Sequence, residues 1–270
     1  MMIEKIRDLW LHRELLWNMT VKELKVKYKR SVLGFVWSFA NPIIMIAVFS
    51  LVFAILAKGA KMQWFVVYLM SGLLPWLFFV NSLMQSVGSV VGNPGLVKKV
   101  YFPREILPLA AVGANIFHFV LQMSVFFVFL LIIRWHFSIY ILLVPLVLLL
   151  EVIFTLGLSL FLSAANVYLR DVQHFVEVAT MAWFWLTPIV YTMSTFSSVA
   201  GKYTPIYLIN PMADIVLMWQ YIIYNPQRYG PSAVYVSPWG FVGTVIVSVA
   251  LLVFGYYFFT RTERGFAEQI

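Results

Sequence analysis

Residues 170–192 place a charged set of side chains directly before an aromatic set. The charged set is Arg170, Asp171, His174 and Glu177, and the aromatic set is Trp183, Phe184, Trp185 and Tyr191. Ionised groups are costly in hydrocarbon, whereas aromatic rings suit a membrane interface or a surface that stacks on flat, half-polar ligands. The pattern predicts a membrane helix that begins in charged residues able to form ion pairs and ends in aromatic residues that either lie at a membrane interface or stack on a ligand.

The stacking surface would suit sugars, whose ring faces are apolar and whose hydroxyl groups can bond Asn and Gln side chains. Trp183 and Trp185 are two residues apart, so their side chains diverge by about 200° around a helix. One of the two should therefore face the interior of the protein.

The sequence lacks the motifs of the common enzyme classes. Gly201-Lys202 is followed by Tyr203, so it forms no phosphate-binding G-x-x-x-x-G-K-[ST] loop, and there is no H-E-x-x-H, no G-x-S-x-G and no cysteine. We therefore expect no enzyme activity, no catalytic residue, no metal site and no cofactor on this chain.

The composition is typical of an α-helical membrane protein. Of the 270 residues, 62% are hydrophobic and 11% are charged, with a mean hydropathy of +0.89. The apolar runs are long and unbroken, unlike the short alternating segments of a membrane β-barrel. We predict an all-α integral membrane fold with six transmembrane helices, an N-terminal amphipathic interface helix and re-entrant half-helices before the last span.

The chain, 1–270, is predicted to form a single transmembrane domain. Its parts are the interface helix (1–30), spans one to five (33–193), an outer re-entrant loop (194–238) and span six (239–260). The individual spans are 33–57, 63–92, 106–133, 137–165, 172–193 and 239–260. The re-entrant prediction depends on 212–224, an apolar run between two Asn-Pro pairs that is too short to cross a bilayer, since crossing needs roughly 20 residues.

The first 30 residues combine an apolar helical face with many Lys and Arg residues. A basic helix with Trp on its apolar side lies along a membrane surface, where it either anchors the chain or guides an anionic lipid substrate. Thr20 and Glu23 form a capping-box pattern, which predicts two short helices with a break near Asn18.

The net charge of +8 does not indicate a nucleic-acid partner, because the basic residues fall at membrane boundaries. Most of the 19 Lys and Arg residues lie on segments that would be inside if both termini were cytosolic. We predict a multi-pass protein with both termini in the cytosol.

Several polar side chains fall inside predicted spans. Gln85 and Asn115 are predicted mainly to join helices by hydrogen bonds. An ionised carboxylate at the depth of Glu151 costs at least about 2.5–3.5 kcal/mol, so it should face protein or water, or be protonated. Glu151 and His118 leave two interpretations open: structural packing, which we favour, or a proton relay in a secondary transporter.

Several motifs in one order resemble a known family. They are KYKRSVLGFVWSFANP at 27–42, SGLLPWLFFVNSL at 71–83, FPREILPL at 102–109, NVYLRDVQHFVEV at 166–178, WFWLTPIVYT at 183–192 and INPM at 209–212. In these motifs the chain resembles the permease subunits of ABC exporters for lipid-linked cell-surface polymers, such as O-antigen polysaccharide or wall teichoic acid.

The resemblance implies a homodimer in the bacterial cytoplasmic membrane, with two copies of a separate ABC ATPase subunit that bind ATP and Mg. The implied ATPase contacts are 3–29, 97–105 and 168–177. An undecaprenyl-diphosphate-linked polymer would pass between the two permeases along a path lined in part by aromatic side chains.

Three sets of site residues follow from the resemblance and from the side-chain types. The set for ATPase coupling is Lys98, Arg104, Glu105, Arg170, Asp171 and Glu177. The set for substrate capture is Lys25, Lys27, Lys29 and Arg30. The set for the polymer path is Trp76, Trp183, Trp185 and Tyr191. The alternative for Arg170 and Asp171 is that they neutralise each other.

Wall teichoic acid is the favoured cargo at this point. The alternatives are an O-antigen or capsular polysaccharide exporter of the same type, a permease for drugs or small lipids, and the proton-coupled secondary transporter.

Overall fold

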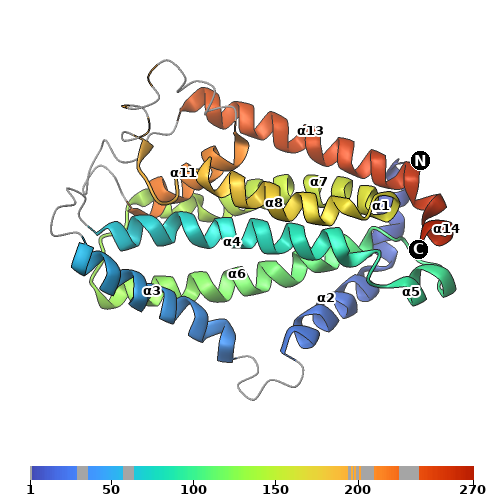
Figure 1. The fold of residues 1–270 in the computed structure, drawn as a ribbon, viewed down its shortest axis with the longest axis horizontal. Coiled ribbons are helices and arrows are strands. Elements are labelled where there is room, and N and C mark those ends of the chain that lie inside the picture. Colours follow the sequence, from blue (N-terminus) through green and yellow to red (C-terminus); the bar gives the residue numbers. More distant parts are fainter. Residues whose placement is uncertain are drawn as a thin grey trace.

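Every regular element in the described part of the chain is a helix, which confirms the all-α prediction. The computed structural model describes residues 2–28, 36–56, 64–193, 196, 198, 201, 210–224 and 237–270. Long helices run side by side, and both termini lie at one end of the bundle, here called the terminal end (Figure 1). The elements in order are α1 (Met2–Leu11), α2 (Arg13–Tyr28), α3 (Trp37–Leu56), α4 (Phe65–Ser89), α5 (Pro94–Lys99), α6 (Ile106–Ile132), η3 (Ile139–Leu143), α7 (Val144–Tyr168), α8 (Asp171–Trp185), α11 (Pro211–Tyr224), α13 (Pro238–Thr262), η5 (Glu263–Gly265) and α14 (Phe266–Gln269).

Four stretches of the described chain are long and apolar enough to cross a membrane. They are Phe65–Ser89, Ile106–Ile132, Ile139–Tyr168 and Pro238–Gln269. These correspond to predicted spans two, three, four and six, and they confirm an integral membrane protein with several crossings. Spans one and five are represented by α3 and by the 15-residue α8, which are shorter. The number of six spans stays a prediction.

The N-terminal segment forms two helices, but the predicted break near Asn18 is wrong. The break falls at His12, between the end of α1 at Leu11 and the start of α2 at Arg13. The His12 ring lies 2.9 Å from the backbone oxygen of Asp8, one turn back. Asn18 therefore lies inside α2.

The capping-box interpretation of Thr20 and Glu23 is also wrong, because both side chains have other partners. The Thr20 hydroxyl donates to the Leu16 backbone oxygen at 2.8 Å, and Thr20 packs on α6, where a Cβ atom at Gly113 would lie 3.2 Å from its oxygen. The Glu23 carboxylate accepts a hydrogen bond of 2.8 Å from Gln85 on α4. These contacts fasten α2 to the bundle.

The fifth predicted span, 172–193, is shorter in the structure, because α8 ends at Trp185. The Leu186 N–H still bonds the Ala182 backbone oxygen at 3.3 Å. Pro188 is two residues beyond Leu186, and proline has no N–H and disfavours helical backbone in the residue before it, here Thr187. The Thr-Pro pair that the sequence places inside the span is thus the feature that ends the helix.

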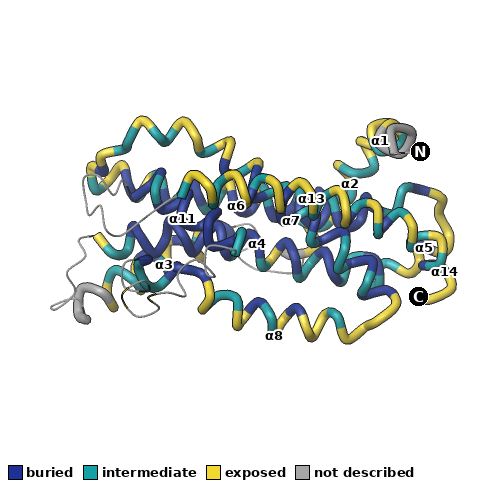
Figure 2. Tube along the Cα trace, turned by 90° about the horizontal axis from the view of Figure 1, so that it is seen from above, coloured by how far each residue is buried: buried dark blue, intermediate teal, exposed yellow. Residues whose placement is uncertain are grey.

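The short helix predicted between the Asn-Pro pairs is present as α11 (Pro211–Tyr224), and its place in the outer leaflet stays a prediction. All of its 14 residues except Pro211 and Tyr221 are buried. It packs against α4, α7 and α13, and Figure 2 shows it largely buried, with α8 on the outside of the bundle. Protein rather than lipid therefore covers this helix.

The buried apolar side chains form two clusters. The larger one lies among α4, α6, α7 and α11. The smaller one lies at the terminal end and joins the ends of long helices to α5 and α14. It consists of Val90, Val97, Phe102, Ile106, Leu107, Leu160, Ala164, Val167, Phe259 and Phe266.

Candidate functional site

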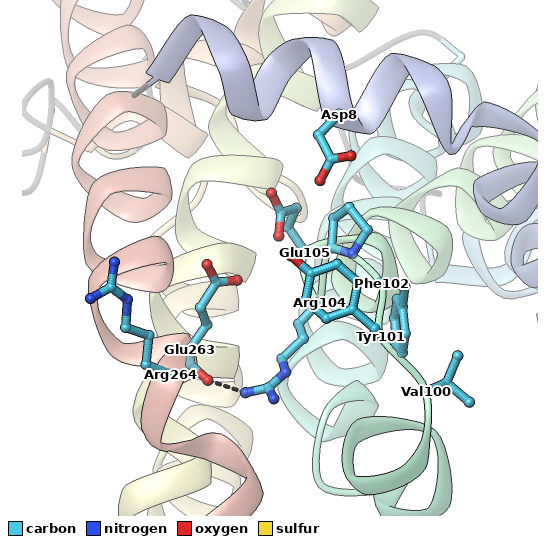
Figure 3. A pocket seen from close by; sticks show the side chains of 9 residues that line it. Asp8, Val100, Tyr101, Phe102, Arg104, Glu105, Glu263 and Arg264 are labelled. Carbon is cyan, nitrogen blue, oxygen red and sulfur yellow. Dashed lines mark hydrogen bonds between the residues drawn. The ribbon is translucent and has the colours of Figure 1, made fainter.

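The terminal end carries a pocket of about 340 Å³ built from three separate parts of the chain (Figure 3). Asp8 comes from α1, residues 100–105 come from the link between α5 and α6, and Glu263 and Arg264 come from η5. This link is part of 97–105, one of the three segments predicted to contact the ATPase.

The side chains of the coupling residues in this segment point in different directions. Lys98 is exposed at the end of α5. The Arg104 guanidinium turns back and donates a hydrogen bond to the backbone oxygen of Glu263 (Figure 3). Glu105 is only 1% exposed, and its carboxylate lies 3.5 Å from the Tyr256 hydroxyl. Lys98 is accessible to a partner, whereas Arg104 and Glu105 hold the link against α13.

The predicted contact segment 168–177 includes the turn between α7 and α8. Arg170 and Asp171 are both exposed there, and Asp171 lies in the first turn of α8, where the helix dipole favours a negative charge. No ion pair joins these two residues in the described structure, so their charges stay available. Glu177 is also exposed and lies 4.0 Å from His174.

A groove of about 420 Å³ lies between α4 and α8. Its lining residues are Trp76, Val80, Met84, Glu177, Thr180, Met181, Phe184 and Trp185. Aromatic rings can stack on flat apolar faces, and a carboxylate accepts hydrogen bonds from hydroxyl groups. The groove therefore brings two residues of the predicted polymer path, Trp76 and Trp185, together with Glu177 of the coupling set.

Trp183 and Trp185 point in different directions, as their spacing predicted. Trp183 turns inward, and its Nε1 donates to the Asn210 side chain at 2.8 Å. Trp185 is 66% exposed and lines the groove. The Tyr191 hydroxyl donates to the Trp185 backbone oxygen at 2.8 Å. Trp185 can contact a ligand directly, whereas Trp183 and Tyr191 support the groove.

The basic set for substrate capture is only partly within the described structure. Lys25 is exposed on α2. Lys27 lies in the same helix, although its side chain is outside the described part, and Lys29 and Arg30 lie outside the described residues. The role of this set stays a prediction.

Side-chain hydrogen bonds join α2, α4 and α6. Asn115 donates to the Gln85 amide oxygen at 2.7 Å, and Gln85 in turn donates to Glu23. Lys22 donates to Asn93, just after α4, at 2.8 Å. The packing role predicted for Gln85 and Asn115 is confirmed, and it extends to the N-terminal helices.

Glu151 and His118, the two residues considered for a proton relay, both contact other helices. Glu151 is fully buried and accepts a hydrogen bond of 2.8 Å from Trp219 of α11. His118 lies 3.4 Å from the Ser38 hydroxyl of α3. The prediction that Glu151 faces protein is confirmed, and its bond joins α7 to α11.

The sequence was also compared with known proteins. Residues 14–224 match the family described as ABC-2 type transporter. The chain belongs to this family. The O-antigen export system permease protein RfbA of Klebsiella pneumoniae is 33% identical over 261 residues, which cover 94% of each chain. The protein of the same name from Myxococcus xanthus is 33% identical over 273 residues, which cover 100% of each chain.

As an ABC-2 type transporter permease, the chain is a transport component rather than an enzyme. A permease of this family works in the membrane with a separate ABC ATPase subunit. The predictions of a multi-pass integral membrane protein and of an ABC ATPase partner are therefore both confirmed.

Sequence reasoning missed part of this transporter's site. Thr180, Met181 and Phe184 follow Glu177 at helical spacings of three and four, so the one-sided arrangement of the groove could have been read from the sequence. Tyr168 gave no such signal, because its partner, the Thr262 backbone oxygen, is 94 residues away.

Proposed function

We propose that this chain is the permease subunit of an ATP-driven exporter that moves a lipid-linked cell-surface polysaccharide across the bacterial cytoplasmic membrane. The observation that carries the proposal is similarity over the full chain to permeases named for O-antigen export. The aromatic groove between α4 and α8 supports a sugar polymer as cargo, because sugar rings stack on such surfaces.

The names of the relatives favour an O-antigen type of polysaccharide. Wall teichoic acid, towards which the overall resemblance of the sequence leaned, stays a prediction for the same test. For either cargo the proposed carrier is undecaprenyl diphosphate, and the capture set on and after α2 would attract its phosphates.

We propose that the terminal end faces the cytosol. Both termini lie at this end (Figure 1), and most Lys and Arg residues fall on segments that this orientation places inside. The exposed side chains of Lys98, Arg170, Asp171 and Glu177 would then be accessible to the ATPase, on which ATP and Mg bind.

We propose a homodimer with two ATPase subunits. The apolar residues Phe175, Val178 and Met181 of α8 are exposed, and α8 lies on the outside of the bundle (Figure 2). The α4–α8 groove is open, so a second copy facing it would enclose a path lined by aromatic residues of both chains. Closure of the ATPases on ATP would move the helices as rigid bodies through the cytosolic segments.

The test is reconstitution of the chain in lipid vesicles with its co-purified ABC ATPase. ATP hydrolysis and uptake are measured with undecaprenyl-diphosphate-linked polysaccharide, with lipid-linked teichoic acid, and with undecaprenyl diphosphate alone. We expect the polysaccharide to stimulate hydrolysis and to be moved only with ATP.

Two outcomes would contradict the proposal. Uphill transport by the permease alone under a proton gradient would indicate a secondary transporter. Equal stimulation by the carrier without a polymer would indicate an exporter of small lipids.

A further inference from the structure

Two consecutive backbone carbonyls at the end of α13 bind side chains from two different cytosolic segments. The Tyr168 hydroxyl donates to the Thr262 oxygen at 2.7 Å, and the Arg104 guanidinium donates to the Glu263 oxygen (Figure 3). The Glu263 oxygen also accepts the backbone N–H of Phe266, so the Arg104 bond is an additional one to a carbonyl that has two lone pairs.

The two donors come from two of the three segments proposed to contact the ATPase, 97–105 and 168–177. Arg104 lies in the link between α5 and α6, and Tyr168 is the last residue of α7, at the turn into α8. These segments are separated by more than 60 residues of chain, yet both are fixed to Thr262 and Glu263. The end of α13 is therefore a common attachment point.

Apolar packing reinforces the two hydrogen bonds. Phe266 of α14 is fully buried, and its ring lies 6.1 Å from the Tyr168 ring and 5.3 Å from the Phe259 ring. The same cluster contains Val97 and Phe102 of the segment 97–105. Both segments thus share a small core with the C-terminal helices, separate from the main core.

The Tyr168 hydroxyl packs tightly against the backbone at Gly265. A Cβ atom at Gly265 would lie 2.6 Å from this hydroxyl oxygen, so a residue larger than glycine would displace the tyrosine. On the other side of the attachment, the Tyr256 hydroxyl of α13 lies 3.5 Å from the buried carboxylate of Glu105. The attachment therefore uses contacts from α13, η5 and α14.

We propose that Thr262–Phe266 is a brace that fixes the distance between the two ATPase-contacting segments, and that Tyr168 and Arg104 are positioning residues for energy coupling. This inference rests on the proposed function for its coupling role. Without the brace, each segment could move independently when the ATPase subunits close. Less of that movement would then be transmitted to the long helices. The brace makes them move as one body.

The first measurement determines the geometry of the brace without any ATPase. Because the sequence has no cysteine, spin labels can be attached at K99C and H174C, one on each segment. Labelled chain is diluted with unlabelled chain in nanodiscs, so that each measured distance lies within one chain. The variants are Tyr168→Phe, which removes only the hydroxyl, and Arg104→Gln. The matched control is Tyr257→Phe, whose hydroxyl bonds Arg261 within α13.

We expect one narrow distance distribution in the parent and in Tyr257→Phe, and a broader one in the two brace variants. The second measurement is polymer moved per ATP hydrolysed in the reconstituted exporter. Because a hydrogen bond contributes a factor of about 2–10 to an equilibrium, we expect this ratio to fall about 2- to 10-fold in each brace variant. The amount of bound ATPase should stay unchanged.

Unchanged distance distributions in both brace variants would overturn the brace itself. Broadened distributions with an unchanged ratio of transport to hydrolysis would overturn its coupling role. If the parent exporter showed no ATP-driven transport, the proposed function would fail instead, and the distance measurement would still decide whether the brace exists.

Discussion

Gly157 on α7 and Gly255 on α13 lie against each other with no side chain between the two backbones. A Cβ atom at Gly157 would lie 2.6 Å from the Leu252 backbone nitrogen, and one at Gly255 would overlap the Gly157 backbone oxygen. Small residues allow this close approach of helices in membranes. The close contact of α7 with α13 therefore depends on both glycines.

Gly255→Ala should destabilise the bundle, because the new methyl group meets backbone that cannot rotate away. We expect a loss of about 1–3 kcal/mol, the usual cost of overpacking, seen as a lower thermal midpoint in detergent. Gly243→Ala in the same helix is the control, since nothing lies within 4 Å of its added Cβ atom. An equal loss in both variants would contradict the explanation.

Substitution of Glu151 separates a packing role from a proton relay. Glu151→Gln keeps an oxygen acceptor for the Trp219 N–H, so we expect export close to that of the parent. Glu151→Leu leaves this donor buried without its partner, which should cost about 1–3 kcal/mol in thermal stability. Loss of export in a stable Glu151→Gln protein would favour the proton relay.

The two neighbouring tryptophans should respond to alanine in different ways. Trp183→Ala removes a core ring and the bond to Asn210, so we expect a loss of stability of about 3–5 kcal/mol. Trp185→Ala changes an exposed groove residue, so the free energy of unfolding should change by less than about 0.5 kcal/mol. The polymer should, however, stimulate ATP hydrolysis less in this variant than in the parent. Thermal midpoints and polymer titrations measure the two effects, and the opposite pattern would exclude Trp185 from the path.

Reversing the charge of Arg170 should abolish export without affecting membrane insertion, because the exposed guanidinium is proposed to form a charge-assisted hydrogen bond with the ATPase. Export and ATPase co-purification are measured for Arg170→Glu. The control is Arg134→Glu, which reverses a charge in the turn after α6, outside the proposed ATPase contacts. Normal export by Arg170→Glu would remove this residue from the coupling set.

Neutralising the basic set for substrate capture should weaken the response to lipid-linked substrate. With glutamine at Lys25, Lys27, Lys29 and Arg30, we expect a higher substrate concentration for half-maximal ATP hydrolysis, since each basic residue near an anionic surface contributes about 1 kcal/mol. Basal hydrolysis without substrate is the internal control. An unchanged half-maximal concentration would show that these residues serve another purpose, such as anchoring.

Properties encoded by composition and short spacing were predictable from the sequence. The long apolar runs determine α4, α6, α7 and α13, and the opposite directions of Trp183 and Trp185 follow from helical geometry. The shortness of α11 follows from the distance between its Asn-Pro pairs. In each of these cases the deciding information lies within one local stretch.

Features that depend on contacts between distant residues were not predictable. Thr20 and Glu23 match a local capping pattern, but packing on α6 and a hydrogen bond to Gln85 override it. The contact of the Tyr168 hydroxyl with the end of α13 corresponds to no pattern in the sequence around either residue. The inward turn of Arg104 was missed for the same reason, because its acceptor is a backbone oxygen, which no residue type reveals.

The burial of α11 has a consequence for biosynthesis. At 1.5 Å per residue its 14 residues reach about 21 Å, short of the roughly 30 Å hydrocarbon layer, and it carries the buried polar side chains of Asp214 and Gln220. α11 packs on α4 and α7, which precede it in the chain, and on α13, which follows it. The Asp214 carboxylate accepts a hydrogen bond from Thr244 of α13, so its buried charge has this partner only after α13 has been made.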